Sequence, residues 1–259
     1  MTEQPPSDNI ATQKPDEFYV GYLPTPASHL KTLRVLIPGV VLAFLAGVAI
    51  ISFVQRDPGS AVWRSQVETF EGIVRTEPWP MLITTTPDGP RVVLLVEEGK
   101  HGAQQRVAPW IGQHVAAKGL VLTRDSRIIL ELVPDDDAIA AAAVLQPAIV
   151  GIAAPDNLAS ALRVSLRGEI IDSKCYHGAM KPGEGKTHKA CATLCISNGI
   201  PAMFIAEDGS AYLLATADGA PLDKDTLSKI GERVEVRGEV TPLADMRVLR
   251  IEPRSVKRL

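Results

Sequence analysis

The chain has 259 residues, of which 46% are hydrophobic and 22% are charged, and its formal net charge is −3. This composition is typical of a folded protein and excludes a wholly disordered chain. Nucleic-acid-binding proteins usually carry a basic excess and aromatic rings on which bases stack, whereas aromatic residues make up only 5% of this chain. We therefore expect no nucleic-acid partner.

The N-terminal part of the sequence predicts a polar arm followed by a membrane-spanning helix. Residues 1–34 are polar and contain several prolines, which favours a flexible arm. Residues 35–54, VLIPGVVLAFLAGVAIISFV, carry no charge, and a helix of this length rises about 30 Å, the thickness of a bilayer's hydrocarbon core. A cleaved signal peptide is the alternative, but the apolar run starts late and is long for one.

The basic residues around this segment are nearly balanced, so they indicate the orientation only weakly. Lys31 and Arg34 precede the segment, and Arg56 and Arg64 follow it. A short arm inside and the larger part outside is the usual arrangement of a single-span protein. We therefore expect a single-pass protein of a bacterial inner membrane with periplasmic, or otherwise extracytoplasmic, C-terminal domains.

From Glu68 onwards the sequence contains an internal repeat with two copies. The clearest match is IGQHVAAKG at residues 111–119 against IGERVEVRG at residues 230–238. Gly72 in the first copy corresponds to Gly168 in the second, where a strand of a small barrel is expected to bend. Each copy alternates apolar and polar residues in short runs separated by glycine-containing turns, which is typical of β-strands.

The order of these runs predicts the fold class. Five short strands with a turn or helix between the third and the fourth is the plan of the OB-fold. We predict a mainly β protein in which the transmembrane helix precedes two tandem OB-like β-barrels, at residues 62–134 and 162–259. An Ala-rich linker or helix at residues 135–161 joins them. Two halves of one larger β-sandwich are the alternative.

The two copies differ at one place. The first copy passes from Gly72 to Pro80 in eight residues. The second needs thirty-three residues to pass from Gly168 to Pro201. The additional residues lie within residues 172–199, here called the insert, and include all three cysteines of the chain. Because the first copy closes without an insert, we expect the insert to carry function.

Five side chains of the insert are candidate metal ligands: Cys175, His177, His188, Cys191 and Cys195. We expect Thr187 to cap a short helix that ends at Asn198. On this helix the last three candidates occupy positions i, i+3 and i+7, so they share one face. Cys175 arrives from the preceding strand, and His177 is a spare donor. Three thiols and one imidazole are the Cys₃His set of a tetrahedral zinc site, and copper and iron are the alternatives.

The same cysteines allow two other chemistries. Outside the cytoplasm, Cys175 can form a disulfide with Cys191 or Cys195, which would make the insert a pinned docking loop and leave one odd thiol. A thiol redox protein would instead use Cys191 or Cys195, with His188 stabilising the thiolate. No hydrolase or P-loop motif is present. We therefore expect a binding or assembly module, accessory to a respiratory or metalloenzyme system and with a protein partner in the membrane, rather than an enzyme.

One basic stretch of the first copy allows two interpretations. Lys100, His101 and Arg106 lie in EEGKHGAQQR, near a glycine turn. We interpret this stretch as a solvated loop. Contact with an anion or a partner is the alternative.

The insert and the strand that follows it resemble a poorly characterised set of bacterial, mostly exported, OB-fold-like proteins. These share a D-x-x-C-Y…H-x-x-C-x-x-x-C…G-x-P pattern. In this chain the pattern falls on Asp172, Cys175, Tyr176, His188, Cys191, Cys195, Gly199 and Pro201. The resemblance covers roughly the last hundred residues and implies an extracytoplasmic location and a site of metal or redox type.

Overall fold

The computed structural model describes residues 25–54, 60–143, 161–252 and 254–259, and the chain divides into two units, residues 1–57 and 58–259. The first unit contains α1 (Ala27–Val54), which is long and apolar enough to cross a membrane and has no buried side chain. The helix begins eight residues before the uncharged run, so the last part of the predicted arm is helical. Residues 1–24 of that arm lie outside the described residues.

The second unit begins with a closed barrel of five strands. Its strands are β1 (Val62–Arg75), β2 (Met81–Thr86), β3 (Gly89–Val96), β4 (His114–Arg124) and β5 (Arg127–Leu132). They lie in the order β1-β2-β3-β5-β4, and β4 pairs with β1 to close the barrel. β3 and β5 are parallel, and the other pairs are antiparallel. The connection from β3 to β4 holds α2 (Gln104–Val107) and the 3₁₀ turn η1 (Ala108–Trp110).

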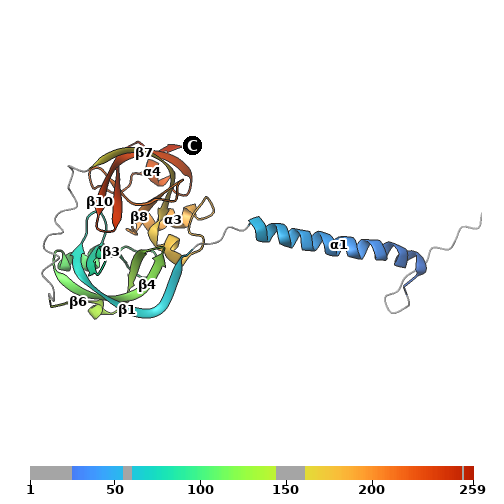
Figure 1. Ribbon diagram of the computed structural model, residues 1–259, viewed down its shortest axis with the longest axis horizontal. Coiled ribbons are helices and arrows are strands. Elements are labelled where there is room, and N and C mark those ends of the chain that lie inside the picture. The colour runs from blue at the N-terminus through green and yellow to red at the C-terminus, as the bar shows by residue number, and fades with distance from the viewer. Residues whose placement is uncertain (1–24, 55–59, 144–160, 253) are drawn as a thin grey trace, which may run out of the picture. The chain divides into compact units, whose positions relative to one another are not determined.

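A second closed barrel repeats this plan. Its strands are β7 (Leu162–Asp172), β8 (Ala202–Ala206), β9 (Ala211–Thr216), β10 (Arg233–Leu243) and β11 (Met246–Ile251), with α4 (Lys224–Leu227) before β10. The order is β7-β8-β9-β11-β10, and β10 pairs with β7. The two barrels are drawn in cyan to green and in yellow to red in Figure 1. The predicted fold class is confirmed, and the sandwich alternative is wrong.

Short elements flank the barrels. Within the range predicted as an Ala-rich linker, the 3₁₀ turn η2 (Asp136–Ala138) leads into β6 (Ile139–Ala141), which pairs with β4 of the first barrel. Residues 144–160 of that range lie outside the described residues. At the C-terminus, β12 (Lys257–Arg258) pairs with β10.

The two repeated glycines occupy places where neighbouring strands come very close. A Cβ atom on Gly72 would lie 2.6 Å from the Ile83 carbonyl oxygen, and one on Gly168 would lie 2.1 Å from the Ile205 carbonyl oxygen. A side chain at either position would therefore collide with the backbone of the next strand. The match between the copies at these positions reflects one steric requirement of each small barrel.

The second unit contains three apolar clusters, one inside each barrel and one between them. Inside the first barrel lie side chains such as Leu82 and Val93, and inside the second lie Phe204 and Leu214. Residues one position away along the same strands point outward and form a third cluster, here called the inter-barrel core. Its fully buried members from β2, β3, β8 and β9 include Met81, Ile83, Val92, Leu94, Met203 and Leu213. These four strands are therefore apolar on both faces.

Directional polar contacts fix how the barrels meet. Trp79 Nε1 of the first barrel donates to the Leu214 carbonyl at 2.7 Å. The Asp245 carboxylate of the second barrel accepts from the Val92 amide at 2.7 Å. Apolar packing alone allows one surface to slide on another, whereas hydrogen bonds to backbone groups define a single arrangement. The two barrels therefore form one packed unit.

Replacing Leu213 by alanine tests this shared core. Leu213 is completely buried between the barrels, so its truncation should lower the free energy of unfolding by about 2–5 kcal/mol. Because both barrels contribute to the cluster, unfolding should stay a single transition when followed by far-UV circular dichroism, which reports the strands of both barrels, in a urea titration. Leu162→Ala, at a 65% exposed position, is the matched control and should change stability by less than about 0.5 kcal/mol. Two separate transitions in the wild type would contradict a shared core.

Candidate metal centre

The insert leaves β7 and returns to β8 through two short helical segments. After β7 ends at Asp172, residues Cys175–Ala179 form a single wide turn, η5, and α3 (Lys189–Ser197) follows. The helix ends as the sequence predicts, with Asn198 as its last cap and Gly199 in the left-handed region at φ +91°. Its beginning differs from the prediction. His188, and not Thr187, occupies the first cap position, and its side chain makes no capping hydrogen bond.

Three predicted ligands meet at one point. Cys175 Sγ, Cys191 Sγ and one nitrogen of His188 all lie within 4.8 Å of one another. The two sulfurs are 4.0 Å apart. Cys175 and His188 are buried and Cys191 is half-buried, so this group of three donors is reached from the Cys191 side. Two thiols and an imidazole are a ligand set for zinc or copper.

Asp172 orients this group. Its Oδ1 accepts from the Cys175 amide at 2.8 Å, and its Oδ2 lies 2.9 Å from His188 Nε2. The carboxylate is completely buried. A carboxylate hydrogen-bonded to one ring nitrogen fixes the orientation of the imidazole, as is common for histidine ligands of metals. One side chain therefore sets the position of both Cys175 and His188.

The structure places the two remaining candidates differently. Cys195 groups with Asp172 and Cys175, whose ligand atoms lie within 4.8 Å of one another, rather than with His188. His177 lies in neither group. Its ring is fully buried, and Nδ1 is hydrogen-bonded to the Ser173 carbonyl at 2.7 Å. Burial lowers the pKa of His177 to about 4, so its ring is neutral at physiological pH.

The three thiols are free, and two of them differ in acidity. All three cysteines lie in the described part of the chain, and none is in a disulfide. The hydrogen bond from the Cys175 thiol lowers the pKa of Cys195 to about 7. The same hydrogen bond, together with burial and the neighbouring Asp172 charge, raises the pKa of Cys175. Cys195 is therefore the more acidic thiol of this pair.

The first barrel contributes a lysine to the site. Lys100 Nζ, from the loop between β3 and α2, lies 2.8 Å from Cys191 Sγ, and this contact raises the pKa of Lys100. The loop is held against the insert by Lys174, which donates to the carbonyls of Glu97 and Gly99. Lys174 also pairs at 2.6 Å with Glu131, and both side chains are almost fully buried. The solvated-loop interpretation of Lys100 is therefore wrong.

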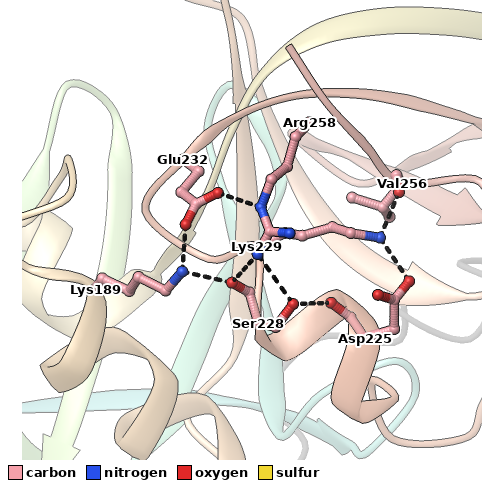
Figure 2. Close-up of polar contacts among 7 residues, drawn as sticks. All are labelled: Lys189, Asp225, Ser228, Lys229, Glu232, Val256 and Arg258. Atoms are coloured by element: carbon pink, nitrogen blue, oxygen red, sulfur yellow. Dashed lines mark hydrogen bonds and ion pairs between the residues drawn. The ribbon is translucent and has the colours of Figure 1, made fainter.

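A network of charges fixes the start of α3 to the second barrel (Figure 2). Lys189 donates to the Ser228 carbonyl and to the Glu232 carboxylate. Arg258, from the C-terminal strand β12, donates to Glu232 and to Ser228. Lys229, next to Ser228 in the chain, donates to Asp225 and to the Val256 carbonyl. The helix that carries Cys191 and Cys195 is therefore held by the first barrel on one side and by the chain terminus on the other.

The roles of two residues of the site were not predicted from the sequence, although Asp172 is part of the pattern quoted above and Lys100 was considered as a contact residue. Asp172 stands three residues before Cys175, which is the spacing of a side chain that accepts from the first turn of a helix, so a local signal was present. Lys100 is 91 residues from Cys191 and lies in the other barrel, so no local pattern indicates their contact.

Comparison with known proteins adds no further assignment, because no family model, curated protein or solved structure matches the chain. The site is therefore interpreted from its own geometry.

The network at α3 predicts a pH dependence of stability. Hydrogen bonds from Lys189 and Arg258 lower the pKa of Glu232 from 4.5 to about 2. Because the folded-state pKa is depressed, the stabilisation should be present above pH 4.5 and disappear as the pH falls towards 2. Glu232→Gln should therefore lower the melting temperature at neutral pH and have no effect near pH 2. Glu71→Gln, on β1, is the control, and equal melting temperatures of Glu232→Gln and the wild type at pH 7 would contradict the assignment.

Proposed function

We propose that this protein is a membrane-anchored metal-binding module whose two barrels lie outside the cytoplasm of a bacterium. The insert would hold the ion, and the protein would serve as a binding or assembly factor for a respiratory or metalloenzyme partner in the same membrane. The observation that carries the proposal is the convergence of Cys175 Sγ, Cys191 Sγ and a His188 nitrogen within 4.8 Å of one another.

The spacing and the environment of these atoms support metal binding over an accidental cluster. Two sulfurs that are each about 2.3 Å from a common ion lie about 3.8–4.0 Å apart, and the observed separation is 4.0 Å. The carboxylate behind His188 supplies the outer hydrogen bond that metal-ligating histidines usually have. Half-burial of Cys191 leaves one side open, as transfer of an ion to a partner requires.

Location and partner rest on other observations. The helix α1 is long and apolar enough to cross a bilayer. The resemblance of the insert to exported bacterial OB-fold-like proteins supports an extracytoplasmic position for the barrels. In that position the thiols would be exposed to an oxidising compartment, in which free thiols form disulfides. A bound metal ion would protect the cysteines from this oxidation.

Metal analysis of the full-length protein tests the proposal. After reduction and incubation with metal, the detergent-purified wild type should retain about one ion per chain. The double variant Cys191→Ser with His188→Ala should retain none, because two of the three converging donors are removed. His101→Ala, which removes an exposed histidine of the neighbouring loop, should bind as the wild type does. A wild type without bound metal would rule out the function.

A thiol redox function is the second candidate, and the short distance between Cys175 and Cys191 favours it. A modest movement would bring sulfurs 4.0 Å apart to the bond length of a disulfide, about 2.05 Å. In this case the two thiols would pass two electrons and two protons to a disulfide substrate, which would be reduced to two thiols, and the protein would be left with a Cys175–Cys191 bridge and no tightly bound metal. Peptide mapping without reductant distinguishes the candidates, since the metal-loaded protein should show only free thiols.

Thiol labelling of intact cells tests the location. With metal removed by a chelator, a membrane-impermeant maleimide should react with Cys191, which is the half-buried thiol of the three. Cys191→Ser should abolish the labelling because Cys175 and Cys195 are buried. Labelling that appears only after the cells are lysed would place the barrels in the cytoplasm and contradict the proposed arrangement.

A further inference from the structure

The lysine beside the cysteines is held in place, and it belongs to a different barrel from the ligands. Lys100 Nζ contacts Cys191 Sγ at 2.8 Å. The residues just before it are fixed, because the carbonyls of Glu97 and Gly99 accept from the buried Lys174. The packing of the two barrels therefore places the positively charged ammonium of Lys100 next to a sulfur of the proposed metal site.

Three of the donors near this charge, Cys175, Cys191 and His188, form one group. Cys195 belongs to a second group, with Cys175 and Asp172. Both oxygens of Asp172 are already engaged, by the Cys175 amide and by His188 Nε2. Zinc in protein structural sites is almost always bound by four ligands in a tetrahedron, whereas thiolate-rich sites also suit Cu(I).

We propose that the site selects the soft monovalent ion Cu(I) over Zn(II), and that Lys100 is the residue that sets this selectivity. The inference rests on the proposed metal-binding function and names its ion. The ammonium repels a divalent ion twice as strongly as a monovalent ion at the same distance. The Asp172 carboxylate contacts the imidazole of His188, whereas the Lys100 ammonium contacts the sulfur of Cys191. Zinc, the first expectation from the sequence, is therefore disfavoured by the charge of Lys100.

The test is a pair of anaerobic competition titrations of the full-length protein in detergent, one with Cu(I) and one with Zn(II), each against a chromophoric chelator of known affinity. The wild type should bind Cu(I) more tightly than Zn(II). Lys100→Met should raise the Zn(II) affinity by about tenfold or more, because a repulsive charge is removed, and should change the Cu(I) affinity by less than about threefold. Lys100→Arg keeps the charge and should retain the wild-type ratio of affinities.

Lys186→Met is the matched control, because it removes the same charge from the insert at a position that contacts neither sulfur. It should leave both affinities unchanged. Tighter binding of Zn(II) than of Cu(I) by the wild type, or equal effects of Lys100→Met on both ions, would overturn the selectivity proposal while leaving the metal site intact. A wild type that binds neither ion, or binding that survives Cys175→Ser with Cys191→Ser, would instead overturn the proposed function itself.

Discussion

The structure depends on the burial of four strands on both of their faces. In each barrel, alternate side chains of two strands fill the barrel while their neighbours pack into the inter-barrel core. Removing this much apolar surface from water is the dominant favourable term available to two small barrels, each of which has a limited interior. This core also determines where the candidate site lies, because the insert leaves the second barrel beside it. Cys175 and Cys195 are themselves buried members of it.

Burial at this place determines the electrostatics of the insert. Buried charges are tolerated when they are paired, and Glu131 and Asp172, the buried acids among the described residues, both have partners. Glu131 pairs with Lys174, and Asp172 is bonded to His188 and to the Cys175 amide. Lys100 then meets Cys191 from the opposite barrel. The site is composite, because the second barrel supplies the donors and the first supplies the nearest cation.

The sequence alone was sufficient to predict the barrels and the end of α3 at Asn198. Alternation of apolar residues, the repeated glycines and the glycine that follows Asn198 are local signals, and each reflects a steric or periodic requirement. The contact of Lys100 with Cys191 depends on how the barrels pack, so it has no local signal. The exclusion of His177 from the ligand groups depends on the turn of η5, which directs its ring to the Ser173 carbonyl. α1 begins earlier than predicted because the polar residues before the apolar run are compatible with a helix as well as with an irregular arm.

These features combine into a single account, in which a duplicated barrel provides a rigid support and one copy carries a sulfur and imidazole site. The account is tested most directly by X-ray absorption spectroscopy of the metal-loaded, full-length protein at the edge of the bound metal. It predicts a first shell of two sulfur atoms and one nitrogen atom at about 2.0–2.3 Å from the ion. A first shell made only of oxygen and nitrogen atoms would show that the cysteines do not bind the ion and would contradict the account.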